Sequence, residues 1–507
     1  MDAGQKEVET RRQVCESLQT RILQKRSLII AANRGPVSFF YDEGGKLQYQ
    51  RSGGGLVTAL AGLAKHVDAT WIASASTPAD REWSSGEISM DGDNSIRVQF
   101  VLPDEPVYDA YYHVISNPLL WFLQHNMWDV ARAPVIDQAT WEAWEEGYVV
   151  VNQMFADAIA KQVRSNRQPT LIMLQDYHLY LVPRMLRNQL RRKAKYTLVY
   201  FVHIPWPGSE VWGLLPGGMR RSILESLCAV DLLGFQTRED GLNFIRSCET
   251  HLPRAATNFR HGRVWYRNHA THVRDFPISI DVDALRKFAK TQEVSEFNRQ
   301  LRETLDHVKI ILRIDRTDPS KNIVRGFQAF GEFLDLYPEF SEKVTFLALL
   351  APSRLEVEEY KNYLDEIMAA AGRVNALFGN SQWEPVRVLV GDDYARAVAA
   401  LQLYEVLLVN SIADGMNLVA KEGSIVNQQD GVLILSERTG ARQQLEQGAI
   451  VIPPWDIYAT AEAIHQALVM DPEERQDRAG RLSWIVERED ISDWLCRQLE
   501  TIEDLGL

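Results

Sequence analysis

The sequence has no apolar run that approaches the roughly 20 residues of a membrane-spanning helix. Its N-terminal residues, Met1 to Glu7, are charged and lack the apolar core of a secretory signal peptide. The four cysteines lie far apart and form no CxxC pair, which is typical of a reducing compartment and offers no zinc site. Together these absences predict a cytoplasmic protein.

Positive charge is also scarce, because 55 lysines and arginines stand against 68 aspartates and glutamates, a net charge of −13. We do not expect so acidic a chain to bind nucleic acid or an anionic membrane. An anionic ligand would have to be held by local basic residues. The 507 residues, 46% hydrophobic and 24% charged, predict a globular protein of more than one domain.

Short apolar segments alternate with amphipathic ones, the pattern of a mainly parallel sheet covered by helices on both faces. In the first half, strands are predicted at residues 28–33, 70–75, 97–102, 170–175, 197–203 and 231–236. Helices are predicted at residues 141–163, 182–195, 219–229 and 239–248. Residues 38–41 and 46–51 should form a hairpin around the turn signal Asp42-Glu-Gly-Gly45.

The pattern weakens at residues 264–280, where residues 276–281 look like a linker, and a second series follows. Its strands are predicted at residues 309–314, 344–350, 386–390, 405–409 and 432–435. Its helices are predicted at residues 323–336, 355–371, 395–403 and 418–426, and from Ala459 to the end.

We therefore predict two Rossmann-like, doubly wound α/β domains facing across a cleft, where open sheets of this type bind ligands. The predicted parts are an extension at residues 1–27, an N-terminal domain at 28–277 and a C-terminal domain at 278–485. A last helix at residues 486–507 should pack back on the N-terminal domain.

The segment from Asn410 to Glu422 follows an apolar strand, and Asp414-Gly415 gives it a turn signal before a helical pattern starts at Asn417. A strand, a tight turn and a helix start point free N–H groups at one spot, which suits a phosphate. Glu422 lies one turn inside the helix and could accept hydrogen bonds from a ribose. An ordinary strand–helix junction with a solvated Lys421 and Glu422 explains the pattern equally well.

Three cations follow predicted strands. Arg316 and Lys321 lie after strand 309–314, and Arg354 lies after strand 344–350. Two cations at such a strand end could neutralise a diphosphate. Solvated loop charges are the alternative.

Polar and aromatic residues mark the first half in the same way. Asp176 follows one predicted strand and His203 ends the next, so the two can meet at one edge of the sheet. A lone histidine is more often structural than catalytic. Tyr111, Tyr112 and Trp121 form an aromatic cluster of the kind that lines sugar sites or fills cores.

The glycine run Gly53-Gly-Gly55 precedes a predicted helix at residues 57–66. Such a run lets a ligand approach the backbone closely, although it is neither a Walker loop nor GxGxxG. A flexible turn is the alternative.

In this order the segments resemble the trehalose-6-phosphate synthase family of retaining glycosyltransferases, from about Leu28 to the C-terminus. That family has the GT-B fold, with two Rossmann-like domains and the active site between them. The matching segments are Ala32-Asn-Arg34, Asp176-Tyr-His-Leu179, His203-Ile-Pro-Trp-Pro207 with Ser209-Glu210, Leu233-Gly-Phe-Gln236, Arg316 with Lys321, and Asp414-Gly-Met-Asn-Leu-Val-Ala-Lys-Glu422.

The resemblance implies roles for the matching residues. The implied donor-binding residues are Gly54, Gly55, Arg316, Lys321, Asp414, Gly415, Met416, Asn417, Leu418 and Glu422. The implied acceptor-binding residues are Arg34, Tyr112, Trp121, Asp176 and Arg354. The implied catalytic residues are Asp176, His203, Arg316 and Lys321. No cofactor or metal is implied, because two cations can hold the leaving diphosphate.

Two segments depart from the family. Trp71-Ile-Ala-Ser74 stands where the family often has Trp-x-Gly-Trp, so one acceptor-side aromatic is missing. Asn410-Ser-Ile-Ala413 replaces Thr-Pro-Leu-Arg. Both look more like validoxylamine 7'-phosphate synthase, a pseudo-glycosyltransferase that joins two cyclitols. That relative lacks the full Gly415–Glu422 segment and the Ser-Gly-Gly-Gly loop, so we expect conventional donor chemistry here.

The expected activity is the transfer of glucose, with retention, from a UDP-, GDP- or ADP-glucose to glucose 6-phosphate, giving trehalose 6-phosphate. The alternative is a synthase with another phosphorylated acceptor, a cyclitol phosphate or glycerol phosphate. A non-catalytic sugar-phosphate sensor is a further alternative, against which the intact Arg316, Lys321 and Glu422 argue. The sequence leaves the donor base and the question of a homo-oligomer open.

Overall fold

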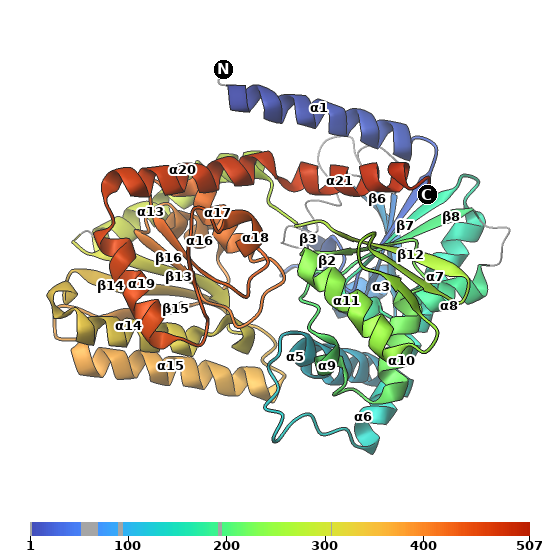
Figure 1. Cartoon of the computed structure of the whole chain (residues 1–507), viewed down its shortest axis with the longest axis horizontal. Coiled ribbons are helices and arrows are strands. Elements are labelled where there is room, and N and C mark those ends of the chain that lie inside the picture. Colours follow the sequence, from blue (N-terminus) through green and yellow to red (C-terminus); the bar gives the residue numbers. More distant parts are fainter. Residues whose placement is uncertain (1–2, 52–68, 90–94, 191–194, 306) are drawn as a thin grey trace. The chain divides into compact units, whose positions relative to one another are not determined.

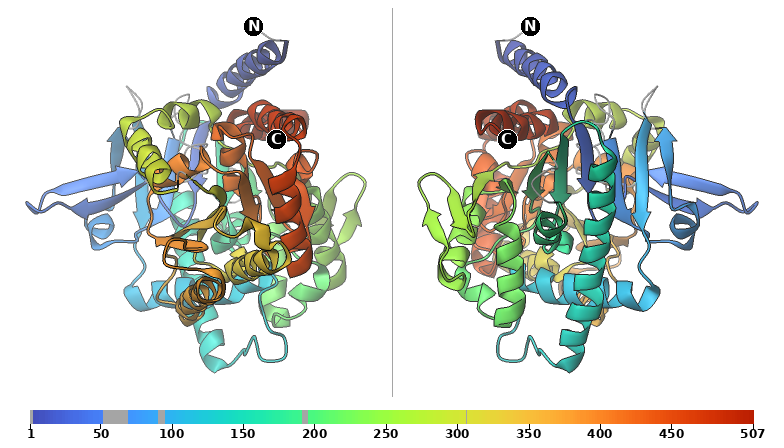
Figure 2. Two further views of the ribbon diagram at one scale, coloured as in Figure 1. Left: turned by 90° about the vertical axis from the view of Figure 1, so that its left-hand side faces the viewer. Right: turned by 90° about the vertical axis from the view of Figure 1, so that its right-hand side faces the viewer.

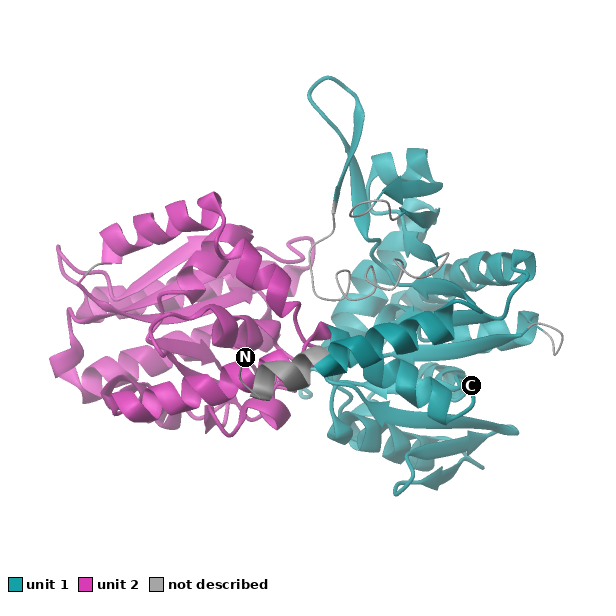
Figure 3. Ribbon diagram, turned by 90° about the horizontal axis from the view of Figure 1, so that it is seen from above, with its two compact units in different colours: residues 1–278, 492–507 teal, residues 279–491 magenta. Residues whose placement is uncertain are grey.

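The computed structural model describes residues 3–51, 69–89, 95–190, 195–305 and 307–507 and divides into two compact units. Unit 1 comprises Met1–Ile278 and Ser492–Leu507, and unit 2 comprises Ser279–Ile491 (Figure 3). Each unit is built on a largely parallel sheet with helices, so the predicted Rossmann-like α/β class is confirmed. The glycine run and the helix predicted at residues 57–66 lie outside the described residues.

Unit 1 contains a ten-stranded sheet in the order β10-β11-β12-β9-β8-β7-β1-β4-β6-β5. Its parallel strands are β1 (Ser27–Ala31), β4 (Ala69–Ser74), β6 (Ser95–Val101), β7 (Thr170–Gln175), β8 (Tyr196–Phe201), β9 (Leu232–Phe235) and β12 (His269–Asp275). The inner strands are nearly continuous apolar runs because helices cover both of their faces.

Antiparallel strands occupy the two ends of this sheet. They are β5 (Ser85–Ser89) at one end and β10 (Ala256–Asn258) with β11 (Arg263–Tyr266) at the other. β10, β11 and β12 explain the weak pattern at residues 264–280, since their half-exposed residues break the apolar runs that mark the inner strands. β2 (Val37–Tyr41) and β3 (Leu47–Arg51) pair as the predicted hairpin (Figure 2).

The helices of unit 1 are α1 (Ala3–Leu23), α3 (Pro78–Trp83), α4 (Glu105–Asp109), α5 (Phe122–Gln124), α6 (Gln138–Glu142), α7 (Val150–Ser165), α8 (Val182–Gln189), α9 (Ser209–Trp212), α10 (Gly217–Leu227), α11 (Arg238–His251) and α21 (Ile491–Asp504). Two π-helical segments, η1 (Ala110–Trp121) and η2 (Ala143–Val149), interrupt the regular helices. The helix predicted at residues 141–163 is confirmed as a continuous helical stretch over residues 138–165, in which η2 is a π-helical segment. A side chain on Gly147 would meet the Ala110 Cβ at 2.6 Å, so glycine lets η1 and η2 pack closely.

Unit 2, drawn in yellow to red in Figure 1, contains a six-stranded parallel sheet in the order β15-β14-β13-β16-β17-β18. The strands are β13 (Lys309–Arg316), β14 (Val344–Ala351), β15 (Val386–Val390), β16 (Val406–Val409), β17 (Val432–Ser436) and β18 (Ile450–Ile452). Its helices are α12 (Val282–Phe288), α13 (Gln292–Leu305), α14 (Ile323–Leu336), α15 (Glu358–Phe378), α16 (Tyr394–Leu401), α17 (Leu418–Val426), α18 (Arg442–Leu445), α19 (Ile457–Val469) and α20 (Pro472–Arg488).

The stretch from Ala459 to the end is helical, as predicted, and comprises three helices, α19, α20 and α21. Asp471 caps α20 by accepting a hydrogen bond from the Glu473 N–H, and Pro472 occupies the first helical position. These two residues separate α19 from α20. The third helix, α21, begins at Ile491.

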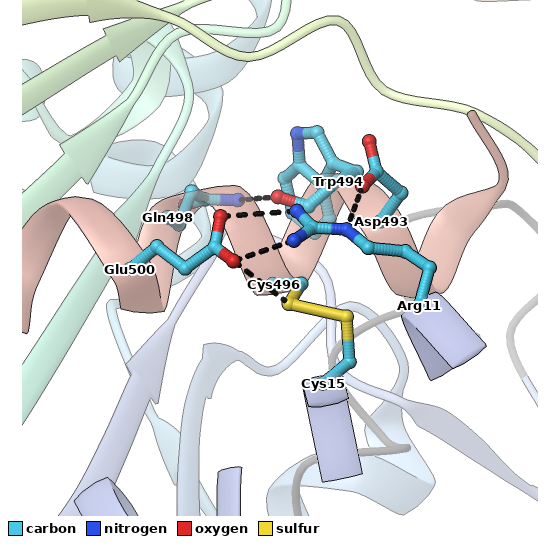
Figure 4. Close-up of a disulfide and its surroundings, with 7 residues drawn as sticks. All are labelled: Arg11, Cys15, Asp493, Trp494, Cys496, Gln498 and Glu500. Atoms are coloured by element: carbon cyan, nitrogen blue, oxygen red, sulfur yellow. Dashed lines mark hydrogen bonds and ion pairs between the residues drawn. A yellow bond between two sulfur atoms is a disulfide. The ribbon is translucent and has the colours of Figure 1, made fainter. Parts of the chain in front are cut away.

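The first and last helices, α1 and α21, lie side by side in unit 1 and are joined by a disulfide between Cys15 and Cys496 (Figure 4). Arg11 adds ion pairs, with Nε 2.9 Å from Asp493 and Nη1 2.6 Å from Glu500. The cysteine spacing gave no sign of this pairing, and the predicted N-terminal extension contains a helix, α1, that the disulfide ties to α21. Among the described residues, no helix is long and apolar enough to cross a bilayer.

Candidate functional site

In unit 2, a fully buried arginine connects the loops that follow the neighbouring strands β13 and β16. Arg313 Nε donates to Asp315 Oδ2 at 2.8 Å, and Nη2 donates to the Lys321 carbonyl at 2.8 Å and to the Asn410 side chain. A buried charge is tolerated only when it is paired and hydrogen-bonded, as it is here. Neither Arg313 nor Asp315 was assigned a role from the sequence, since Arg313 lies inside the predicted apolar strand at 309–314 and Asp315 directly follows it.

The same loops bring together two predicted donor residues. Lys321 Nζ forms an ion pair with Asp414 Oδ2, and each side chain is only 13% exposed. Asn417 Nδ2 donates to the same carboxylate oxygen at 3.1 Å, and Ser411 Oγ donates to it at 3.4 Å. A cation, an amide and a hydroxyl therefore converge on Asp414.

Helix α17 begins at Leu418, as predicted, and Asn417 forms its cap. The Asn417 side chain accepts a hydrogen bond from the Ala420 N–H at 3.0 Å, while its backbone adopts a φ of 72°. The first turn of a helix leaves backbone N–H groups without intrahelical acceptors. Gly415 and Met416, both buried, complete the turn from β16 to α17.

Glu422 and Lys421, one turn into α17, are both perturbed by burial. Burial raises the pKa of the Glu422 carboxyl to about 7, and the Tyr394 hydroxyl donates to Glu422 at 3.1 Å. Burial lowers the pKa of Lys421 to about 7, and its Nζ donates to Gln444 at 2.7 Å. The alternative of a solvated Lys421 is therefore wrong, whereas the Glu422 side chain is half-buried.

Two further cations of unit 2 share one carboxylate. Asp318 is fully buried and lies 3.9 Å from Arg316 Nη2 and 3.5 Å from Arg354 Nη1. Arg354 also donates to the Tyr360 hydroxyl, and its side chain is only 9% exposed, whereas that of Arg316 is 45% exposed. The Arg316 side chain is thus partly accessible to solvent, whereas that of Arg354 is largely buried.

In unit 1, the predicted strand ends bring Asp176 and His203 together. The Asp176 carboxylate accepts a hydrogen bond from the His203 backbone N–H at 3.3 Å, and the Asp176 carbonyl accepts one from Tyr200 at 2.6 Å. Asp176 has a φ of 69°, an uncommon backbone conformation for a residue with a side chain.

Two glutamines that were assigned no role from the sequence, Gln175 and Gln236, fix the His203 ring. Gln175 Oε1 lies 2.9 Å from Nε2, and Gln236 Nε2 lies 3.5 Å from Nδ1. Burial lowers the pKa of His203 to about 3, so the ring is neutral near pH 7. With a proton on Nε2, the ring donates to Gln175. Both glutamines end parallel strands or directly follow them, which is the signal that could have revealed them.

The predicted aromatic residues divide between surface and core. Tyr112 is half-buried and stacks between Tyr108 and His178, with centroids 5.5 and 5.8 Å away. Trp121 is only 6% exposed and stacks on His125 at 4.0 Å. Both remain compatible with a sugar site, but Trp121 also belongs to the core.

The acceptor-side departure falls at the end of β4. Ser74 is buried, and its Oγ has no hydrogen-bond partner among the described residues. Arg34, which follows β1, is exposed, and its carbonyl accepts a hydrogen bond from Trp71 Nε1 at 3.3 Å. A buried hydroxyl without a partner is costly, which marks Ser74 as a candidate contact for a ligand.

The predicted site residues thus fall into two sets. Unit 1 holds Arg34, Tyr112, Trp121, Asp176 and His203, and unit 2 holds Arg316, Lys321, Arg354 and the segment from Asp414 to Glu422. Gly54 and Gly55 lie outside the described residues. Within the described part of the chain, no group of three or more histidine, cysteine or carboxylate side chains could hold a metal ion.

Comparison with known proteins identifies the family to which the chain is similar. The model of glycosyltransferase family 20 matches residues 26–504. The alpha,alpha-trehalose-phosphate synthase [UDP-forming] of Botryotinia fuckeliana is 34% identical over 92% of this chain and 87% of its own length.

Solved structures are similar over most of the chain. The E. coli trehalose-6-phosphate structure bound with UDP-2-fluoro glucose is 27% identical, with a TM-score of 0.81, and covers 94% of this chain and 98% of its own. The Burkholderia xenovorans alpha,alpha-trehalose-phosphate synthase in complex with glucose-6-phosphate is 27% identical, with a TM-score of 0.79, and covers 95% and 100%.

Proposed function

The chain belongs to glycosyltransferase family 20, and on that premise we propose that it forms trehalose 6-phosphate. The reaction would move glucose from a nucleoside-diphosphate-glucose to glucose 6-phosphate with retention of configuration. One observation carries the proposal: Lys321, Asp414, the start of α17 and Glu422 are assembled by the loops after β13 and β16. The names of the relatives favour UDP as the leaving group.

Unit 2 would bind the donor. Arg316 and Lys321 supply two cations for the diphosphate, and the first turn of α17 adds backbone N–H donors and the positive end of its dipole. Glu422 would accept hydrogen bonds from the ribose hydroxyls. Asp414, already held by Asn417 and Ser411, would exchange Lys321 for a sugar hydroxyl as the diphosphate takes over the cation.

Unit 1 would serve the acceptor and orient the donor sugar. The Asp176 side chain is held at the His203 backbone, and the neutral His203 ring offers a hydrogen bond rather than a proton. The chemistry would be a front-face attack, in which the leaving phosphate takes the proton of the acceptor hydroxyl. The protein then mainly positions the reactants and stabilises developing charge. Asp176 as a covalent nucleophile is the alternative.

A cyclitol phosphate is a second candidate acceptor. The observation that favours it is Ser74, whose buried hydroxyl stands where the family often has an aromatic ring. A ligand with an additional hydroxyl or amine could satisfy this oxygen, whereas an aromatic ring could only pack against a sugar.

A matrix of donors against acceptors tests these proposals. UDP-, GDP- and ADP-glucose should each be offered with glucose 6-phosphate, a cyclitol phosphate, glycerol phosphate and free glucose, and products identified by mass and NMR. Trehalose 6-phosphate should be the main product. Turnover only with a cyclitol phosphate would replace the trehalose assignment, and no turnover with any pair, despite nucleotide binding, would favour a sensor.

We propose that the N-terminal unit is the acceptor domain, that the C-terminal unit is the nucleotide-sugar domain and that the protein acts in the cytoplasm. The disulfide between Cys15 and Cys496 would be exposed to reduction there. Fractionation of the native source, followed by alkylation of free thiols, tests the location and the state of this pair together.

A further inference from the structure

Unit 1 contains a hollow of about 520 Å³ beside α11, and none of its lining residues is assigned to the site above. One wall is the face of α11 that carries Arg238 and Gly241, and the other is the segment leading into β11 together with the end of β12. Figure 1 shows α11 and β12 at this place, and Figure 2 shows the yellow-green hairpin at the edge of the sheet. The volume suits a small molecule.

Cationic side chains dominate the lining. Arg238, Arg260, Arg263 and Arg274 face a single carboxylate, Asp275. None of the four arginines has a carboxylate of the described residues within 4.0 Å. Like charges repel when they are gathered without counter-ions, so this concentration of positive charge in a chain of net charge −13 requires an explanation.

Hydrogen bonds fix the two inner arginines in place. Arg274 Nη1 donates to the carbonyl oxygens of His261, Gly262 and Val273 at 3.1, 3.2 and 2.8 Å. Its Nε and Nη2 make no hydrogen bond to any described residue. Burial, and then the charge of Arg263, lowers the pKa of Arg274.

Arg263 is anchored in a similar way. Its Nε donates to His272 Nδ1 at 3.1 Å, which leaves both Nη groups without a partner in the described part of the chain. Burial and then the charges of Arg263 and Arg274 lower the pKa of His272, which keeps that ring neutral and able to accept the bond. Both guanidinium groups are thus preorganised with donors left over.

Glycine makes this arrangement possible. Gly262 has a φ of 54°, and a Cβ there would lie 2.5 Å from the Val273 carbonyl oxygen and 2.9 Å from Arg274 Nη1. A larger residue would displace the guanidinium that Arg274 presents. The turn is therefore shaped around this arginine.

We propose that this hollow binds a small phosphate-bearing anion with at least two negative charges, at a site separate from the proposed substrate residues. Guanidinium groups match phosphate oxygens with paired N–H donors, and four of them exceed the charge of Asp275 by three. Phe259, Leu242 and Ile245 line the remainder of the hollow and provide an apolar wall for an organic portion.

Helix α11 connects this hollow to the residues around His203. Asp240 accepts a hydrogen bond from the Trp206 N–H at 2.7 Å, and Asn243 donates to the Trp206 carbonyl at 3.1 Å. Gln236, just before α11, contacts the His203 ring. An anion held by Arg238 at the start of α11 would restrain this helix, and with it the segment from His203 to Trp206 that the helix positions.

Calorimetry with inorganic pyrophosphate tests the site on the full chain. Because pyrophosphate would also occupy the proposed donor cations, the background carries Arg316→Ala and Lys321→Ala. One pyrophosphate per chain should still bind this background. Adding Arg238→Gln and Arg260→Gln, at two exposed side chains that form no ion pair with a described residue, should weaken binding at least tenfold. Adding Arg263→Gln and Arg274→Gln as well should weaken it at least a hundredfold.

The matched control is Arg246→Gln, an exposed arginine of the same helix that does not line the hollow, which should leave binding unchanged. Absence of saturable binding in the donor-site background would overturn the proposal, as would equal binding after Arg238→Gln and Arg260→Gln. Those results say nothing against the donor site, which is assayed with UDP in the wild type. The chain should not sediment with vesicles of anionic phospholipid. If the wild type does sediment with them and the Arg238→Gln, Arg260→Gln variant does not, the ligand is a lipid headgroup rather than a free anion.

Discussion

Lys321 and Asp414, 93 positions apart in the sequence, form an ion pair where the loops after β13 and β16 meet. In this pair Asp414 holds Lys321, which is one of the two cations proposed to bind the diphosphate. A diphosphate would thus compete with Asp414 for Lys321, and its arrival would free the carboxylate for the sugar. Binding of nucleotide and placement of the sugar would be coupled by a single side chain.

Removing the donor cations should weaken nucleotide binding. Arg316→Ala and Lys321→Ala should each reduce UDP affinity and transfer at least tenfold, about 1.4 kcal/mol or more, since each loses a charge-assisted bond. Lys343→Ala, an exposed lysine of the same unit, is the control and should change neither. Unchanged UDP affinity by calorimetry in both variants would contradict the assignment.

Nucleotide affinity should depend on pH through Glu422. Its pKa is raised from 4.5 to about 7, so the carboxyl is protonated below that pH and loses an acceptor for the ribose diol. Affinity for UDP should therefore rise about tenfold between pH 6 and pH 8. Glu422→Gln should remove this rise. Lys421, whose pKa is also about 7, loses its charge over the same pH range, so it can contribute only a fall in affinity. An undiminished slope in Glu422→Gln excludes Glu422 as the titrating group.

Transfer should proceed without a divalent metal. Arg316 and Lys321 provide the positive charge that a metal would otherwise bring to the diphosphate, so excess chelator should leave the rate unchanged within a factor of about two. The measurement is product formation after dialysis against EDTA. Loss of activity that magnesium or manganese restores would show that the two cations are insufficient.

The covalent link between α1 and α21 should stabilise unit 1. Reduction of the disulfide, or Cys15→Ser, should lower the free energy of unfolding of unit 1 by about 2–4 kcal/mol. The reason is that the link between Cys15 and Cys496 no longer restricts the unfolded chain. The measurement is the midpoint of thermal unfolding with and without reductant. Reductant should have no further effect on Cys15→Ser, and an equal shift in both proteins would assign the effect to another cause.

The sequence indicated much of the fold because its inner strands are continuous apolar runs. β7, β14 and β15 lie at or within one residue of their predicted bounds, and α17 begins and ends where its pattern does. β18 was missed because it has only three residues, and η1 and η2 because helical periodicity does not distinguish a widened turn.

The candidate site was predictable at strand ends and not within strands. Asp176, His203, Lys321 and Asp414 follow or end apolar segments, so their shared location could be inferred. Arg313 lies inside β13, and only the fold shows that it spans two loops. The sequence offered no reason to single out Asp318, which is fully buried and lies within 4.0 Å of both Arg316 and Arg354.

The last prediction concerns the acceptor and depends on Arg354. Its guanidinium is largely buried against Asp318 and Tyr360, so it is held in place before any ligand arrives. A phosphate on the acceptor would add charge-assisted bonds, each worth roughly 1.5–3 kcal/mol. Glucose 6-phosphate should then be used several orders of magnitude better than free glucose.

Arg354→Ala should narrow that ratio by reducing kcat/KM for glucose 6-phosphate while leaving the slow reaction of free glucose unchanged. Arg373→Ala, an exposed arginine of α15 in the same unit, is the matched control and should preserve the ratio. Comparable turnover of the two acceptors by the wild type would refute the phosphate requirement. A preserved ratio in Arg354→Ala would leave the requirement in place and move the phosphate to another cation, with Arg34 as the next residue to change.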